Sequence, residues 1–476
     1  MPVLAIDQGT SGTKAAVVAD DGTVLAISER QVQPRYLADG GVEHDPQQLL
    51  ESVVGTGREA VAHAATTIDA VSLANQGETV LAWDRQTGEP LSPAIVWQDR
   101  RSESVCAGLD DHRAEIRHRT GLELDSYFSA PKMTWLRENV TRDGVITTSD
   151  TWLVHALTGE FVTDRTTASR SLVTDLNTTE WDANLLALFG LDSEALPTIV
   201  DNDAIVGTTK AFGPSAPVGG LVVDQQAALL AQGCLKPGSA KCTFGTGAFV
   251  LANAGESPTR SHHGLATSVA WRLREQTAYC LDGQAYTAAS AIKWLQNLGL
   301  IDHPSDLDRL AVEETEGVIF VPALAGLAAP WWRPDARASF IGMGLASERG
   351  HLVGAVLEGI AAQTVEVIDA MHGDISQSLD VLRVDGGLTR SRRLMQAVSD
   401  IGQVTVEVFP SSHATALGAA VCARMAAHPS ITLPDGVPSW SPAAVYRPRW
   451  SPDRAADFRR SWLAAATSTF PQKDPR

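Results

Sequence analysis

A carboxylate and an amide stand where a short apolar run gives way to a helix-like segment. The run Gly219-Gly-Leu-Val-Val223 is followed at once by Asp224 and Gln225. A carboxylate in this place could take a proton from an attacking alcohol, which is the usual way in which a kinase activates its acceptor. Asp224 could equally cap the helix that follows it, because aspartate is a preferred N-cap residue. The residues alone leave both interpretations open.

Two turns rich in glycine and threonine suggest a phosphate-binding site. They are Gly9-Thr-Ser-Gly-Thr13 and Phe244-Gly-Thr-Gly247. Glycine lets backbone N–H groups approach phosphate oxygens, and hydroxyl and ammonium groups add donors. The candidate phosphate or nucleotide contacts are Thr10, Ser11, Lys14, Gly245 and Thr246. Neither turn has the spacing of a P-loop, and each alone could be a hairpin that satisfies its own backbone.

Two more strand ends carry an acid. Asp7 closes the apolar run that begins at Val3, and a carboxylate there could hold magnesium, usually through water. Asp385-Gly-Gly387 closes a second run, and glycine at position 387 would let a flat adenine or ribose lie on the backbone. Because three glycine turns all follow apolar strands, together they favour a nucleotide-dependent phosphotransferase.

Two residues further along the first half could bind a polyol. Glu78 lies in a turn after the apolar run 68–73, and Trp97 ends the run 93–97. A carboxylate can accept hydrogen bonds from hydroxyl groups, and an indole can stack on a carbon chain. The alternatives are a solvated loop acid and an ordinary core tryptophan.

The pattern of apolar residues predicts strands alternating with helices, hence an α/β fold with mixed sheets. Residues 3–27 read as a meander with an Asp-Gly turn, and residues 113–197 as mostly helical. Similar turns near residues 4–19 and 242–251 suggest two related halves. We therefore expect two domains, residues 1–232 and 233–476.

Composition limits the partners. The formal net charge of −18 argues against nucleic acid and anionic membranes as ligands. The five cysteines are scattered, without the spacing of a zinc site or a disulfide framework. Since the N-terminus reaches a carboxylate early and no apolar run has membrane length, we expect a cytoplasmic protein.

In several of these segments the chain resembles the FGGY carbohydrate kinases, and among them the glycerol kinases most closely. The segments are Ala5-Ile-Asp-Gln-Gly-Thr10, Asn75-Gln-Gly-Glu-Thr79, Pro93-Ala-Ile-Val-Trp-Gln98, Asp125-Ser-Tyr-Phe-Ser129, Asp224-Gln-Gln-Ala-Ala228, Phe244-Gly-Thr-Gly247 and Val384-Asp-Gly-Gly387. They occur in the family's order from about residue 3 to residue 424.

The resemblance implies two actin-like, ribonuclease-H-like ATPase domains that flank a catalytic cleft. ATP and Mg²⁺ would lie mainly against the second domain and a small polyol against the first. The implied roles are general base for Asp224, magnesium for Asp7, phosphate contacts for Thr10 and Thr246, and nucleotide contacts for Gly245 and Gly387. The implied polyol contacts are Glu78, Trp97, Tyr127, Asp224, Gln225 and Phe249. Members of the family are often homodimers or homotetramers, so either state is expected here.

One position departs from the glycerol kinase pattern. Glycerol kinases usually have arginine immediately before the glutamate, and here that residue is Gly77. Without the five guanidinium donors, polyol hydroxyls lose hydrogen-bond partners, which costs about 1–3 kcal/mol of binding free energy. The missing side chain also leaves space in the site. The alternative acceptor is therefore a four- or five-carbon polyol or ketose, such as erythritol or xylulose. A non-catalytic nucleotide sensor is disfavoured because Asp7, Asp224 and the glycine turns are all intact.

Overall fold

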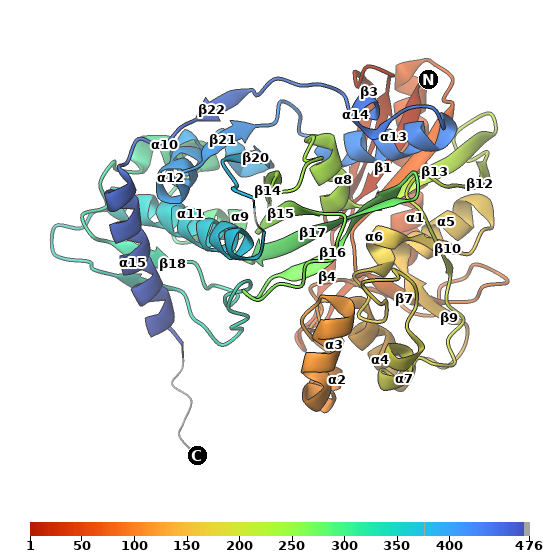
Figure 1. Cartoon of the computed structure of the whole chain (residues 1–476), viewed down its shortest axis with the longest axis horizontal. Coiled ribbons are helices and arrows are strands. Elements are labelled where there is room, and N and C mark those ends of the chain that lie inside the picture. The colour runs from red at the N-terminus through yellow and green to blue at the C-terminus, as the bar shows by residue number, and fades with distance from the viewer. Residues whose placement is uncertain (376, 471–476) are drawn as a thin grey trace.

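Two large mixed sheets form the centre of the structure, a computed structural model that describes residues 1–375 and 377–470 (Figure 1). The first sheet has six strands, in the order β12 (Ile205–Thr209), β13 (Ala216–Val223), β6 (Ala70–Asn75), β1 (Val3–Gln8), β2 (Gly12–Val18) and β3 (Val24–Gln31). The second has seven, in the order β16 (Ala266–Leu273), β17 (Gln276–Ala285), β15 (Ala248–Gly255), β14 (Ala240–Phe244), β20 (Val381–Asp385), β21 (Thr405–Val408) and β22 (Ala444–Tyr446). The expected α/β class with mixed sheets is confirmed.

Strand direction in the first sheet decides where the polar strand ends meet. β1, β2 and β3 form the predicted antiparallel meander. β6 lies parallel to β1 on one side and to β13 on the other. The carboxyl ends of these three parallel strands therefore meet at one edge of the sheet, which is where ligands bind in open α/β sheets.

Helix α1 (Pro46–Ala64) covers one face of the first sheet. It begins after Asp45, whose carboxylate accepts a hydrogen bond of 2.9 Å from the backbone N–H of Gln47. Its apolar side places Leu49 and Val53 in the same buried cluster as Leu4 and Ile6 of β1.

The opposite face of the first sheet is covered by α8 (Asp224–Ala231) and α13 (Ala414–Ala427). The small residues of α13 allow very close packing. A Cβ on Gly418 would lie 1.9 Å from the carbonyl oxygen of Ala227 in α8, and a Cβ on Gly220 of β13 would lie 2.4 Å from the backbone nitrogen of Ala423. Although α13 follows residue 233 in the chain, it packs against β1, β6 and β13.

The second sheet packs on α11 (Arg349–Asp374), the longest helix of the described residues. This helix is long and apolar enough to cross a membrane, but 78% of its most apolar window is buried inside the protein. It is therefore a core helix. The other elements of this half are α9 (Ala289–Asn297), η2 (Pro304–Asp306), α10 (Leu307–Leu310), β18 (Ile319–Val321), β19 (Ser339–Ile341), η3 (Gly387–Arg390), α12 (Arg392–Gly402), α14 (Leu433–Gly436) and α15 (Pro452–Ser468).

The middle of the first half has short helices and short strands. Residues 113–197, which composition predicted to be mostly helical, contain five helices and two strands. The elements of the whole middle region are β4 (Arg35–Tyr36), β5 (Val42–His44), β7 (Val80–Trp83), β8 (Ala94–Ile95), α2 (Glu103–Gly108), η1 (Asp110–His112), α3 (Arg113–Thr120), α4 (Ser129–Asn139), β9 (Val145–Thr148), α5 (Ser149–Thr158), β10 (Val162–Asp164), α6 (Arg165–Ala168), α7 (Ala183–Leu188) and β11 (Thr198–Val200). Five of the strands form a further sheet in the order β4-β5-β8-β7-β9.

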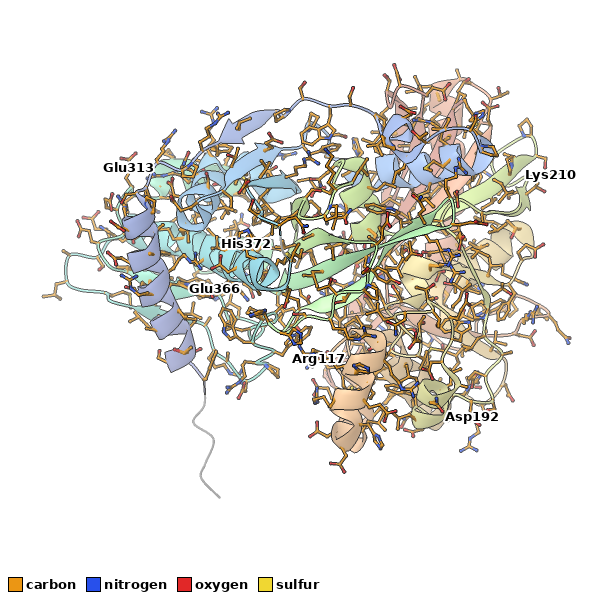
Figure 2. The ribbon with its side chains drawn as sticks, viewed as in Figure 1. Arg117, Asp192, Lys210, Glu313, Glu366 and His372 are labelled. Carbon is orange, nitrogen blue, oxygen red and sulfur yellow. The ribbon has the colours of Figure 1, made fainter. Side chains whose placement is uncertain are left out.

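A long hairpin, β16–β17, joins the two halves (Figure 1). The backbone N–H of Val269 donates to the hydroxyl of Ser169 at 3.1 Å, and that of Thr267 donates to the carbonyl of Gly121 at 2.8 Å. Nearby, Arg117 on α3 points toward the loop before β16 (Figure 2), where its guanidinium donates to the carbonyl of Ser261 at 2.8 Å. The sequence had not assigned any element to this segment.

Candidate active site

A cavity of about 280 Å³ lies between the strand ends of the two sheets. Most of the predicted site residues line it together. They are Thr10, Ser11, Gly77, Glu78, Trp97, Tyr127, Asp224, Gln225, Thr246 and Phe249. Gln33, Pro34, Tyr36, Gln76 and Gln98 complete the lining. The acceptor contacts expected from the first half thus share one pocket with turns from both halves.

Asp224 is the first residue of α8, directly after β13. The position before it, Val223, is the N-cap and makes no side-chain capping bond. The Asp224 carboxylate instead accepts a hydrogen bond of 2.6 Å from the N–H of the next residue, Gln225. Conventional capping therefore does not account for this acid, and its carboxylate faces the pocket.

The electrostatic surroundings of Asp224 act in both directions. Burial raises the pKa of Asp224 above its usual range, while the charges of Lys241 and Arg170 lower it. Burial and the nearby negative charges of Asp224 and Asp385 raise the pKa of Asp7 to about 7, and Lys14 opposes that shift. The strand ends thus bring several carboxylates close together, and their combined charge would attract a cation.

Glu78 is held in an unusual backbone conformation with a buried ion pair. Its φ is +62°, in the left-handed region that non-glycine residues seldom adopt. Its side chain is 3% exposed and pairs with the guanidinium of Arg170. Arg170 in turn donates to Asp282 of β17 at 2.7 Å. A buried Glu78–Arg170–Asp282 chain therefore connects the acceptor pocket to the second sheet.

Three aromatic side chains form one wall of the pocket. The Trp97 ring lies 5.4 Å from Tyr127 and 6.1 Å from Phe249, the latter edge to face. The Trp97 indole N–H donates to the hydroxyl of Thr10 at 2.8 Å. Because Phe249 belongs to β15 of the second sheet, this wall is built by both halves of the chain.

Gly77 has room for a side chain. A Cβ there would meet Val223 at 3.4 Å and the Cδ of Arg170 at 3.8 Å, which are ordinary contacts. Arg170 passes behind this position rather than through the pocket, because it is absent from the lining. The space that the sequence suggested at position 77 is present.

The remaining predicted residues, Asp7, Lys14, Gly245 and Gly387, do not line the cavity. Asp7, near the end of β1, is paired across the hairpin with Lys14 of β2. Gly387 opens η3, and a Cβ on it would meet nothing within 4 Å. Gly245 is also open, since a Cβ on it would meet only the Gly247 carbonyl, at 3.9 Å. Both glycines leave backbone accessible to a flat or anionic ligand.

Two basic residues near the site were missed by sequence reasoning. Arg170 and Lys241 are almost completely buried and contact the predicted Glu78 and Gln225. Lys241 carries a readable signal, because a lysine inside the apolar strand β14 needs a polar partner. Arg170 carries no comparable signal, since its partner Glu78 is far away in the chain.

Two α/β halves facing each other across a pocket of carboxylates and glycine turns define a phosphotransferase of the actin-like class. Family models agree: the FGGY N-terminal domain matches residues 2–231 and the FGGY C-terminal domain matches residues 240–427. The chain belongs to the FGGY family of carbohydrate kinases. It is therefore an ATP-dependent kinase with an alcohol group as acceptor.

Individual proteins give the same result. The chain is 43% identical over 435 residues to a glycerol kinase of Gloeobacter violaceus, covering 89% of this chain and 88% of that protein. It is 41% identical over 482 residues to a glycerol kinase of Thermus brockianus, covering 97% of each. Among solved structures, Plasmodium falciparum glycerol kinase with ADP superposes with a TM-score of 0.92 at 35% identity, over 99% of both chains. A xylulose kinase from Lactobacillus acidophilus has the same fold, with a TM-score of 0.88 at 20% identity over 98% of this chain and 97% of that one.

Proposed function

We propose that this protein transfers the terminal phosphoryl group of ATP to a terminal hydroxyl of glycerol. The observation that carries the proposal is the position of Asp224, a half-buried carboxylate in a pocket walled by Trp97, Tyr127 and Phe249. Relatives at 43% and 41% identity that are glycerol kinases support glycerol as the acceptor.

In this proposal each part of the pocket has a task. Glu78, Gln225 and Tyr127 bind the polyol hydroxyls, while Trp97 and Phe249 pack on its carbon chain. Asp224 takes the proton of the attacking hydroxyl. Thr10, Ser11, Lys14 and Thr246 donate to phosphate oxygens, and the open backbone at Gly245 and Gly387 receives the nucleotide. Positioning and charge stabilisation supply most of the rate enhancement in such transfers.

Magnesium fits the carboxylate set. Among residues 1–375 and 377–470 no group of three or more His, Cys, Asp or Glu side chains is arranged to hold a metal by itself. Mg²⁺ is usually bound by one or two carboxylates together with substrate phosphates and water. We assign Asp7 as its protein ligand, and the bound ion would neutralise phosphate charge.

We further propose that residues 1–232 form the acceptor-binding domain and residues 233–476 the nucleotide-binding domain. Asp224 belongs to the first, and Gly245, Thr246 and Gly387 to the second. Closing the gap between them would exclude water, which competes with the polyol as phosphoryl acceptor. A cytoplasmic location, where ATP is available, is consistent with five free and buried cysteines.

Erythritol or xylulose is the second candidate acceptor, favoured by the open space at Gly77. A coupled ADP-release assay of the wild-type protein with glycerol, erythritol and xylulose separates the candidates. We expect the highest kcat/KM with glycerol. ADP release no faster with any of the three than with water would contradict a polyol kinase, and a clear preference for erythritol or xylulose would favour the second candidate.

The role of Asp224 is tested by Asp224→Asn. The variant should bind ATP normally and lose at least about 100-fold in kcat, the usual range for a general base. Near-normal turnover would remove Asp224 as the base.

A further inference from the structure

Lys241 is a fully buried cation one layer behind the pocket. It lies on β14, and its ammonium group donates to the side-chain oxygen of Gln225 at 2.5 Å and to the hydroxyl of Thr243 at 2.8 Å. The Thr243 hydroxyl in turn bonds to the carboxylate of Asp385 at 2.6 Å. A continuous polar chain therefore runs from the acceptor pocket to the end of β20.

The direction of every bond in this chain is fixed. An ammonium group can only donate, so both Gln225 Oε1 and Thr243 Oγ1 accept from Lys241. The hydrogen of the Thr243 hydroxyl must then point to Asp385, which is an acceptor when ionised. Because the Gln225 oxygen is held by Lys241, the other end of the amide, its NH₂ group, is the donor that this residue offers to the pocket that it lines.

Lys241 also balances charge. Among the residues that the structure describes, it has no carboxylate within 4.0 Å, so it is not neutralised by a direct ion pair. Its charge lowers the pKa of both Asp224 and Asp385, and in each case it is the largest influence after burial. An uncompensated charge is seldom kept in a protein interior unless nearby groups of opposite sign require it.

We propose that Lys241 is a positioning residue for phosphoryl transfer. It turns the Gln225 amide so that its NH₂ group donates a hydrogen bond to a hydroxyl group of the polyol substrate. This inference rests on the proposed function, because it assumes that an alcohol occupies the pocket. It also restricts the polyol substrate. The substrate hydroxyl that contacts Gln225 must accept a hydrogen bond, while the hydroxyl that contacts Asp224 donates its proton. The strand end that carries Asp385 holds the same chain in place from the nucleotide side.

Lys241→Met tests the proposal because methionine has a similar length without the charge. In the ADP-release assay we expect KM for the acceptor to rise about tenfold or more, from loss of the oriented donor. KM for ATP should change less than threefold. An unchanged acceptor KM would overturn the proposal.

A double-mutant comparison separates orientation from a general structural role. If Lys241 acts through Gln225, then adding Lys241→Met to Gln225→Leu should raise the acceptor KM no further. Full additivity of the two effects would overturn the proposal. Should Lys241→Met not fold, Thr243→Val provides a second variant that loosens the same ammonium group, and it should raise the acceptor KM by a smaller factor without changing KM for ATP.

The pH profile gives an independent readout. The groups whose charges act with Asp224 are Lys241, Arg170, Asp7, Glu78 and Tyr127. Removing only the Lys241 charge should raise the pKa of Asp224, so the acidic limb of kcat/KM should move to higher pH. If the acidic limb of the pH profile does not move, Lys241 does not balance the charge of Asp224.

The two proposals fail in different ways. If the proposed function is wrong, the wild-type protein is inactive with glycerol, erythritol and xylulose. If this inference is wrong, the wild-type protein is active and Lys241→Met behaves like it.

Discussion

The indole N–H of Trp97 donates a 2.8 Å hydrogen bond to the hydroxyl of Thr10. Trp97 belongs to the aromatic wall of the acceptor pocket, and Thr10 to the turn that we assign to phosphate binding. One bond therefore joins the two sides of the proposed reaction. Binding of either substrate can alter the geometry of the other through this contact.

Thr10→Val should break the contact between the acceptor pocket and the phosphate-binding turn. Valine keeps the shape of the side chain but leaves the indole N–H without its partner, and an unsatisfied buried donor costs about 1–3 kcal/mol of free energy. We expect KM to rise several-fold for both ATP and polyol, measured by varying each substrate at saturation of the other. Thr10→Ser keeps the hydroxyl and is the matched control. An effect of equal size in both variants would show that the hydroxyl is not the important group.

Gly77→Arg should narrow acceptor choice. A Cβ at this position meets only ordinary contacts, so the larger side chain can enter the pocket. Its guanidinium adds donors for a short polyol and fills the room that a longer one needs. We expect the ratio of kcat/KM for glycerol over erythritol to increase about tenfold, or 1.4 kcal/mol. Gly77→Ala, which adds bulk without donors, is the control, and an unchanged ratio in the arginine variant would contradict the assignment.

Gly418→Ala should damage catalysis from outside the pocket. A Cβ there would lie 1.9 Å from the backbone of Ala227, so α13 and α8 must separate, and α8 begins with Asp224. We expect a loss of about 1–3 kcal/mol in unfolding free energy together with a lower kcat, although alanine is the better helix former. Gly108→Ala is the control, because nothing lies within 4 Å of a Cβ at that helical position. Equal stability of the two variants would refute the close packing.

Asp150→Asn should change how stability depends on pH. Burial and the charge of Asp164 raise the pKa of Asp150 from 3.8 to about 7 in the folded protein. Between about pH 4 and pH 7 the folded state binds a proton that the unfolded state has lost, so stability falls as pH rises through this range. Asparagine does not titrate, so it removes this pH dependence of stability. Its side-chain oxygen can still accept a hydrogen bond from the hydroxyl of Thr163, which donates to Asp150 at 2.7 Å.

The expected result is a variant that is more stable than wild type at pH 8, by up to about 3 kcal/mol, and similar near pH 4. Urea unfolding at both pH values measures it. Asp192→Asn, at the exposed edge of the molecule near α7 (Figure 2), is the matched control and should not change the slope. A parallel pH dependence of wild type and Asp150→Asn would contradict the prediction.

Sequence reasoning was most successful where a local pattern determines the structure. The meander over residues 3–27 follows from alternation and an Asp-Gly turn, and it is confirmed. Thr10, Glu78 and Asp224 could be predicted because each follows an apolar strand, whereas Tyr127 and Phe249 were implied only by the family resemblance. Parallel strands then bring Gln8, Asn75 and Val223 to one edge, and with them the acids nearby.

Long-range relationships were not predictable in this way. Arg170 meets Glu78 and Asp282 only because α6 and the β16–β17 hairpin pack together, and no local pattern encodes that contact. In the segment 113–197 tryptophan and leucine indicated helices, which are the main elements there, but the two short strands β9 and β10 were not predicted. Propensity is a weak guide where burial on both sides decides the conformation.

The seating of α13 on the first sheet has a consequence for biosynthesis. Val3, Ala5 and Ala16 share a buried cluster with Ala416, Ala420 and Ala423, which are translated some four hundred residues later. A nascent chain that ends before this helix exposes an apolar sheet face to solvent, so the N-terminal half cannot reach its final form early during synthesis. Its maturation waits for nearly the whole polypeptide to leave the ribosome.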